Sequence, residues 1–367
     1  MLSSLLIARS GLVIKVRSSQ PSDLRWLEEC LRPGFSVVTD GRYDWEILVQ
    51  VDGFRYRQLQ DGGSATGRPV VPVFSFDSEV GEYPVWNGEP LTIHDREFRL
   101  FYRVCSAEKL VEVVTAAPLP SLRVALLRLV REISTQHLVR RGQIQFHGAV
   151  VSLAGQGLMI CGPKRAGKTS LTIHLLQDPA ARFLSNDRAL VELGAQPPAM
   201  VSGMPTVIAI RPGALTLFPD LPLSQIRHWR ARQTLVESLN LVSHAASGPQ
   251  PAKLDMNPEQ FCHFLGTAAV AVAPLRAVLF PRVNPQQPHV EITRLDMAEI
   301  SGRLLTNLLL PGYSVITSSM GESWSLDLVR KRVNQIAAEI LGLEIVLGEG
   351  AYLDRTAAAR VLERLGL

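Results

Sequence analysis

Short stretches in which apolar and polar residues alternate mark the first third of the chain. Such stretches are Ser36–Val38, Trp45–Val51 and Phe98–Val104, with Gly, Pro and Asp between them, and an apolar run at Leu5–Ala8 precedes them. A period of two is typical of half-buried β-strands, and Gly, Pro and Asp favour the turns that join them. We therefore predict a mostly β domain over residues 1–117. It carries no catalytic motif, so its candidate role is to hold a substrate.

Helical spacing replaces this alternation after Pro120. Apolar residues then recur every three or four positions, with arginines on the opposite face: Leu122, Ala125, Leu126, Leu129, Val130 and Ile133. This pattern predicts an amphipathic helix. We expect the helix to occupy residues 118–142 and to connect two domains.

Strand-like and helix-like segments follow one another in the remaining residues, 143–367. A strand at Ile144–Leu153, a turn at Gly155–Gly157 and a strand at Leu158–Cys161 predict a hairpin. Two strand-then-helix units lie later in the chain, at Val290–Leu309 and from Ile345 to Leu365. Together with the first region, this order indicates an α/β protein.

One motif has a specific chemical meaning. Residues 162–169 match the phosphate-loop (Walker A) pattern G-x-x-x-x-G-K-[ST] in full, and they lie between a strand and a helix expected at Thr169–Gln177. The two glycines allow positive φ, so that backbone N–H groups and the helix N-terminus can surround a phosphate. Lys168 is expected at the β- and γ-phosphates of ATP and Thr169 at Mg²⁺. The expected nucleotide-binding residues are Gly162, Pro163, Lys164, Arg165, Ala166, Gly167, Lys168, Thr169 and Ser170.

An acidic residue ends the next apolar segment. Arg182–Arg188 has the pattern of a short strand, and Asp187 lies at its C-terminal end. An Asp in that place lies beside a phosphate loop, where it either ligates Mg²⁺ or accepts the proton of a hydroxyl. The alternative is a turn or helix-cap role.

Three further residues are candidates for contacts with substrate or phosphate. His147 lies on a strand, where a neutral imidazole can orient an acceptor; the alternative is a structural histidine. Arg211 follows an apolar strand and either neutralises a transferred phosphate or is a solvated turn residue. Lys253 lies in a Pro-rich polar stretch typical of a loop, where it either contacts nucleotide or substrate or is a surface lysine. Lys164 and Arg165 either add charge at the phosphates or face solvent.

Composition excludes several classes of protein. Lys and Arg number 38 against 34 Asp and Glu, a net charge of +4, and only six of the 38 are lysine. The arginines are spread along the chain without interleaved aromatics, which argues against nucleic-acid binding. The four cysteines lack metal-binding spacing and indicate thiols in a reducing cytoplasm. No apolar stretch approaches the ~18 residues of a membrane span, so we expect a cytoplasmic protein without a membrane partner.

Four segments together resemble the core of the HPr kinase/phosphorylase family. They are Phe146–Val151 with its His-Gly pair, Gly157–Gly162, the Gly-Lys-Thr at 167–169, and Phe183–Arg188. In that family a His-Gly strand, a turn, the phosphate-loop strand, one helix and a strand ending in Asp-Asp-Arg follow in this order, and phosphoenolpyruvate carboxykinases share the plan. The resemblance covers residues 140–215. It implies a P-loop kinase domain with a mixed sheet and flanking helices.

The resemblance also implies an activity: ATP- and Mg²⁺-dependent phosphorylation of a hydroxyl, usually a serine, here of a peptide or protein. Asp187 then matches the second Asp as base or metal ligand, Arg188 the following Arg, and His147 the histidine. Asn186 replaces the first Asp, and Met200–Pro205 lacks the Glu and Arg of the family's downstream Glu-x-Arg-Gly signature. The chain is therefore more similar to the diverged HPr kinase-related proteins of peptide-modification systems, and the reverse phosphorylase reaction is not implied. The expected catalytic residues are Asp187, His147, Lys168 and Arg211, and the expected metal ligands Thr169 and Asp187.

Two other functions stay open on the sequence. A small-molecule hydroxyl kinase would use the same residues. A nucleotide-dependent switch or assembly ATPase would bind ATP through the same loop and transfer no phosphate. The chain lacks an N-K-x-D stretch, which disfavours a GTPase, and it lacks an arginine cluster beside the loop, which disfavours a carboxykinase. A homo-oligomer stays open as well.

Overall fold

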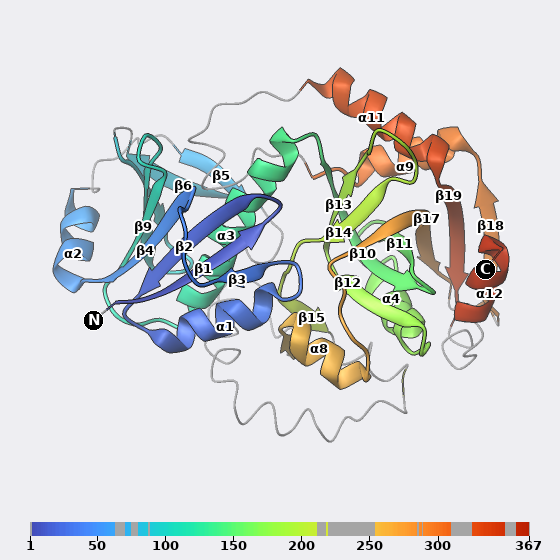
Figure 1. Cartoon of the computed structure of the whole chain (residues 1–367), viewed down its shortest axis with the longest axis horizontal. Helices are drawn as coiled ribbons and strands as arrows, with labels where there is room; N and C mark the ends of the chain where they lie inside the picture. Colours follow the sequence, from blue (N-terminus) through green and yellow to red (C-terminus); the bar gives the residue numbers. More distant parts are fainter. Residues whose placement is uncertain are drawn as a thin grey trace.

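Two mixed β-sheets with helices packed against them make up the described part of the protein (Figure 1). The computed structural model describes residues 2–62, 70–74, 80–86, 89–210, 218, 254–284, 286–287, 289–309, 325–348 and 357–366. This arrangement confirms the α/β class with mixed sheets and flanking helices.

The N-terminal sheet has nine strands among the described residues. Their order is β3-β1-β2-β4-β9-β8-β7-β6-β5, and the pairs β2–β4 and β4–β9 are parallel. Alternate residues of β1, β2 and β4 are buried, as expected for strands with one face on a core. The bounds are β1 Ser3–Arg9, β2 Leu12–Ser18, β3 Ser36–Val38, β4 Trp45–Val51, β5 Val70–Phe74, β6 Val80–Trp86, β7 Leu91–Asp95, β8 Leu100–Cys105 and β9 Leu110–Thr115.

Three helices accompany this sheet: α1 (Pro21–Leu31), α2 (Gly53–Asp61) and α3 (Ser121–Arg140). In Figure 1, α3 lies between the two sheets. Its apolar residues share one core with α1 and the N-terminal strands, and that core also includes Leu190 and Met204 from the second region. The helix expected to connect two domains is therefore packed on both sides rather than exposed as a linker.

A buried polar network holds α3 against the N-terminal sheet. Arg128 donates from Nη1 to Oδ2 of Asp95 at 3.2 Å, and its guanidinium lies 4.7 Å from the centre of the Phe98 ring. The Tyr102 hydroxyl donates to the same carboxylate at 3.2 Å. A buried ion pair that is also hydrogen-bonded is costly to break. The network therefore fixes the position of α3 and of the residues one turn further along it.

The second sheet has eight strands among the described residues, in the order β11-β10-β13-β14-β17-β19-β18, with β12 beside β10. β17 also pairs with β11, and the pairs β11–β17 and β17–β19 are parallel. A separate pair, β15–β16, lies outside this sheet. The bounds are β10 Ile144–Leu153, β11 Gln156–Cys161, β12 Ala181–Ser185, β13 Arg188–Glu192, β14 Met200–Gly203, β15 Ile208–Ile210, β16 Leu254–Met256, β17 Val272–Val283, β18 Glu291–Leu295 and β19 Leu341–Leu347.

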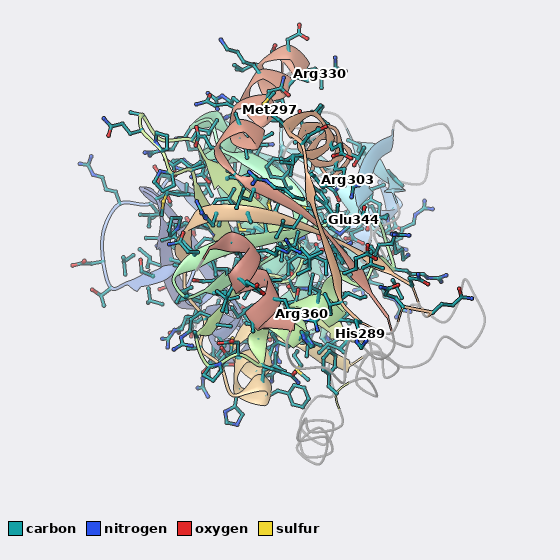
Figure 2. The ribbon with its side chains drawn as sticks, turned by 90° about the vertical axis from the view of Figure 1, so that its right-hand side faces the viewer. His289, Met297, Arg303, Arg330, Glu344 and Arg360 are labelled. Carbon is teal, nitrogen blue, oxygen red and sulfur yellow. The ribbon has the colours of Figure 1, made fainter. Side chains whose placement is uncertain are left out.

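Helices cover both faces of the second sheet. The helices α4 (Lys168–Leu176), α8 (Pro258–Leu265) and α12 (Ala357–Leu365) pack on one face, and α9 (Met297–Thr306) and α11 (Leu326–Glu339) on the other. Figure 2 shows Arg303, Glu344 and Arg360 at this end of the molecule. Arg303 of α9 forms an ion pair with Glu344 of β19 at 2.7 Å, and Arg360 of α12 donates to the carbonyl O of Val290 at 3.1 Å. None of the described helices is long and apolar enough to span a membrane.

Three features of the second region differ from the sequence-based predictions. The hairpin turn is at Ala154 and Gly155, both with positive φ, so β11 begins two residues before Leu158. The strand expected at Arg182–Arg188 is split into β12 and β13 by a two-residue connection. The central strand β17 was not predicted, because Pro274 and Pro281 within it are unusual for a central strand.

Candidate active site

The candidate active site lies where both edges of β10 change partners. On one edge β10 pairs with β13 up to His147, which lies opposite Arg188, and with β12 from Val150. On the other edge the chain after α9 bridges to Phe146, and β11 pairs from Gly148, which lies opposite Cys161. Points at which neighbouring strands diverge leave room for ligands in α/β sheets. This strand switch brings His147 next to the start of residues 162–169, which we call the glycine loop.

A glycine at position 148 is required by the close approach of β10 and β11. A Cβ added there would lie 2.8 Å from Sγ of Cys161 and 3.0 Å from the carbonyl O of Ile160. Any side chain would therefore push the strands apart. The Gly148 N–H also donates to the carbonyl O of Asp187 at 2.9 Å. The His-Gly pair thus has a packing role in addition to any chemical one.

The glycine loop connects β11 to α4. Gly162 and Gly167 have φ of 156° and 97°, and Arg165 has a φ of 70°, which is uncommon for a residue other than glycine. α4 begins at Lys168, and no side chain caps its N-terminus. The first N–H groups of a helix have no partner within the helix, so an uncapped end offers donors and a positive dipole to an anion.

Lys168 is held by the loop that precedes it. Its Nζ donates to the carbonyl O of Gly162 at 2.7 Å and to that of Pro163 at 3.1 Å. An ammonium group has three donors, and no described residue accepts the third. Burial lowers the pKa of Lys168, and the charge of Asp187 partly raises it again. Ala166, Thr169 and Ser170 are half-buried, whereas Lys164 and Arg165 are exposed.

Asp187 lies in the connection between β12 and β13. Its Oδ1 accepts from Nε2 of His147 at 3.1 Å, and its Oδ2 lies 3.6 Å from Nε of Arg188. Burial by itself raises the pKa of Asp187, but the hydrogen bond from His147 and the charge of Arg188 outweigh burial, so that the pKa lies well below its usual range. The group is therefore ionised at any physiological pH. That state suits a cation ligand better than a strong base.

A guanidinium from α3 adds positive charge at the same place. Burial and the like charge of Arg188 lower the pKa of Arg131 to about 9, and the charge of Asp187 opposes that shift. Arg128, one turn earlier, is paired with Asp95 instead. Three cations, Arg131, Arg188 and Lys168, thus lie near two carboxylates, Asp187 and Glu132. This leaves a surplus of positive charge that an anion can balance.

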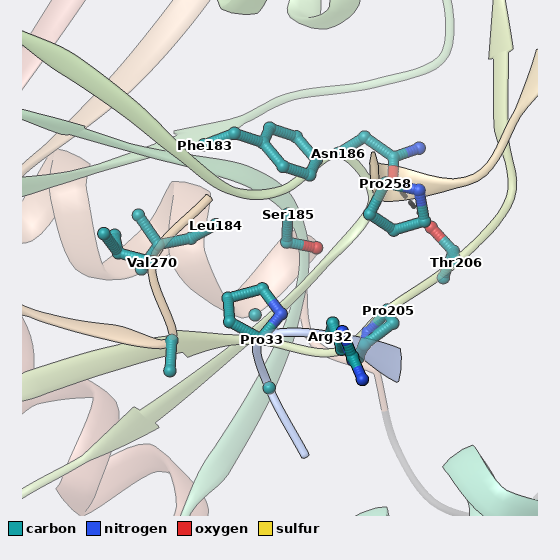
Figure 3. A pocket seen from close by; sticks show the side chains of 13 residues that line it. Arg32, Pro33, Phe183, Leu184, Ser185, Asn186, Pro205, Thr206, Pro258 and Val270 are labelled. Atoms are coloured by element: carbon teal, nitrogen blue, oxygen red, sulfur yellow. Dashed lines mark hydrogen bonds between the residues drawn. The ribbon is translucent and has the colours of Figure 1, made fainter. Parts of the chain in front are cut away.

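Asn186, next to Asp187 in the chain, lines a small pocket. Its Oδ1 accepts from the Thr206 hydroxyl at 2.6 Å, a bond that Figure 3 shows as a dashed line. The pocket walls come from the loop after α1, from the ends of β12 and β14 and from the start of α8, and they include Arg32, Pro33, Ser185, Pro205 and Pro258. Asn186, at the place of the family's first Asp, therefore has a structural contact.

The strand β14 occupies most of the segment that lacks the Glu-x-Arg-Gly signature. Arg9 of β1 is buried against it and donates to the carbonyl O of Gly203 at 2.8 Å and to Oγ of Ser202 at 3.0 Å. The N-terminal sheet thus contacts the strand next to β13. Two candidates from the sequence, Arg211 and Lys253, lie outside the described residues.

Sequence reasoning missed two residues at this site, Arg131 and Asn307. Arg131 was one of several arginines on the polar side of a predicted helix, and Asn307 follows α9, more than a hundred residues after the loop. Neither has a motif that could have marked it.

Over the described ranges, no three His, Cys, Asp or Glu side chains gather in a way that would hold a metal ion. Comparison with protein-family models gave no match. Comparison with curated proteins gave none either.

Proposed function

We propose that this protein is an ATP- and Mg²⁺-dependent kinase that transfers the γ-phosphoryl group to a hydroxyl of serine or threonine in a peptide or protein. The observation that carries the proposal is the closeness of the glycine loop to the His147–Asp187 pair: Cys161, just before the loop, lies opposite Gly148, and the charge of Asp187 acts on Lys168. A phosphate loop alone does not separate kinases from switches. An ionised carboxylate beside the loop lysine is a feature that phosphoryl transfer uses. The order β10, β11, loop, α4 and β12 also agrees with the HPr kinase core that the sequence resembles.

The glycine loop fits a triphosphate. The uncapped start of α4 supplies N–H donors, and Lys168 is fixed by two carbonyl groups with one N–H left to donate. A cation that is already held in place loses little entropy when a phosphate arrives. Binding of the nucleotide therefore needs few new side-chain arrangements in this loop.

Thr169 and Asp187 are the two oxygen donors that would hold Mg²⁺. This cation usually keeps several waters and is bound by one or two protein groups plus substrate phosphates. A site with two protein donors is therefore sufficient, and no three-ligand cluster is required. When bound, Mg²⁺ neutralises charge on the phosphate oxygens.

The remaining groups act on the acceptor and on the transferred phosphate. With its Nε2–H donated to Asp187, a neutral His147 has Nδ1 as a proton acceptor for a hydroxyl. Asp187 would then orient His147 in addition to binding the cation. Arg131 and Arg188 stabilise negative charge that develops during transfer. Arg211 stays a candidate for the same role.

The proposal is tested with γ-labelled ATP and pools of serine- and threonine-containing peptides. We expect label to appear on peptide with the wild type and not with Asp187→Ala. ATP binding without transfer to any peptide or small hydroxyl compound would favour a nucleotide-dependent switch. The loop is tested separately by ATP affinity. We expect Lys168→Ala to lose binding and the matched control Lys331→Ala, an exposed lysine of α11, to retain it; unchanged affinity in Lys168→Ala would refute the loop assignment.

A further inference from the structure

We propose that Asn307 is a positioning residue that holds the glycine loop and the strand of His147 in one fixed relation. Its side-chain Oδ1 accepts from the N–H of Gly162, the first residue of the loop, at 3.0 Å. Its backbone carbonyl accepts from the N–H of His147 at 2.7 Å. One residue therefore contacts both parts of the site. The catalytic meaning of this contact rests on the proposed function, whereas its effect on the loop does not.

Both ends of the Asn307 amide are used. The side chain is buried, with the residue 9% exposed, and Nδ2 donates to the carbonyl O of Arg303 at 2.7 Å and to the Thr306 hydroxyl at 3.3 Å. Arg303 and Thr306 belong to the last turn of α9. Only an amide offers an acceptor and two donors on one short group. Asp in this place would lose the donors and would put a negative charge beside the loop.

Contacts of Arg303 hold the end of α9 against the second sheet, and they thereby fix the position of Asn307. Besides its ion pair with Glu344, the guanidinium of Arg303 lies 5.4 Å from the centre of the Phe280 ring on β17. Figure 2 shows Arg303 and Glu344 side by side. Beyond Asn307 the chain continues along β10, where the Leu309 N–H donates to the carbonyl O of Gln145 at 3.0 Å.

The bond to Gly162 matters because of where it acts. Gly162 is buried and has a φ of 156°. Because it is a glycine, the backbone at this first residue of the loop can adopt many other conformations. Loss of the acceptor leaves a buried N–H without a partner, which a structure avoids by local movement. Movement at residue 162 would displace the carbonyl group that holds Lys168. Asn307 therefore supports the lysine through the loop.

The experiment compares two variants of Asn307 with a matched control. Asn307→Ala removes all three hydrogen bonds of the side chain. Asn307→Ser retains a hydroxyl that can donate to the carbonyl O of residue 303, four positions earlier, but is too short to reach Gly162. The control, Asn257→Ala, removes another buried asparagine, whose Oδ1 accepts from the Gln260 N–H at 2.8 Å in the first turn of α8.

Two measurements are made on each full-length variant: amide hydrogen exchange at residue 162 and affinity for Mg·ATP. We expect faster exchange and about tenfold weaker binding in both Asn307 variants, because one buried hydrogen bond is lost. Asn307→Ser should keep a Tm close to the wild type, so that weaker binding cannot be ascribed to unfolding. In the transfer assay the KM for Mg·ATP should rise more than kcat falls.

Wild-type exchange and affinity in the Asn307 variants would overturn the proposal. Equal losses in Asn257→Ala would also overturn it, because they would reflect general destabilisation. If Asn307→Ala does not fold, Asn307→Ser carries the test alone. If the wild type binds no ATP, the proposed function fails, and exchange at residue 162 still decides whether Asn307 holds the loop.

Discussion

Replacing Asp187 by Asn removes one negative charge and keeps the shape of the side chain. The pair with His147 is 40% and 38% exposed, so solvent screens it, and we expect a loss of only about 1 kcal/mol in the free energy of unfolding. The loss in phosphoryl transfer should be much larger, roughly 10³-fold or about 4 kcal/mol, as for removal of a positioned catalytic group. We therefore predict that Asp187→Asn strongly reduces phosphoryl transfer but only slightly reduces the free energy of unfolding.

The pH dependence of stability gives an independent check. The folded-state pKa of Asp187 lies below its usual value, so its contribution to stability is present above about pH 4 and is lost as the pH falls further. The difference between wild type and Asp187→Asn, measured by urea unfolding, should therefore shrink below pH 4. Around pH 7 the difference in stability should not change with pH.

Transfer is measured with γ-labelled ATP on the acceptor identified for the wild type. Asp178→Asn is the matched control, because this half-buried aspartate of the α4–β12 turn accepts from the Ala180 N–H and lies outside the cluster of cations. Transfer by Asp187→Asn within threefold of the wild type would refute the catalytic assignment. A stability loss of several kcal/mol would refute the claim that the pair is screened.

Three further predictions follow from contacts at the site. Arg131→Gln should raise the pKa of Asp187 in an NMR titration and should weaken transfer about tenfold, because one of its stabilising charges is gone; an unchanged pKa would contradict this. Gly148→Ala should cost about 1–3 kcal/mol in urea unfolding, because its Cβ would overlap Cys161, and a neutral result would contradict the close approach. Burial raises the pKa of Cys161 to about 12, so its thiol should resist disulfide reagents at pH 8 until the protein unfolds; rapid reaction in the native state would show that it is accessible.

Local patterns account for the elements that were predicted correctly. β4 and β10 have the predicted bounds, Trp45–Val51 and Ile144–Leu153, because both combine apolar runs with clear turn residues at their ends. β17 was missed because Pro274 and Pro281 suggest an interrupted or edge strand. In the structure β17 is central, and its partners β11, β14 and β19 are distant in sequence. A local pattern contains no information on such pairings.

The same distinction applies to the site. The glycine loop is contiguous, so its motif could be read directly, and Asp187 follows it by one helix and one strand. Asn307 is 145 residues from Gly162, and its role depends on the register of the chain after α9 along β10. Arg131 precedes the loop on a helix whose rotation is set by the Arg128–Asp95 pair. Only the three-dimensional packing selects these two residues.

The position of α3 changes how the division of the chain is understood. The pattern of apolar residues predicted a connecting helix at residues 118–142, between a substrate-holding domain and a catalytic domain. Yet Arg131 of that segment acts on the charge of Asp187, and Arg128, one turn away, is bound to Asp95 of the N-terminal sheet. Arg9 of β1 also joins the two regions, through its hydrogen bond to the carbonyl O of Gly203 in β14. The two regions therefore meet at the candidate site: α3 contributes the charge of Arg131, and the N-terminal sheet contributes support through Asp95 and Arg9.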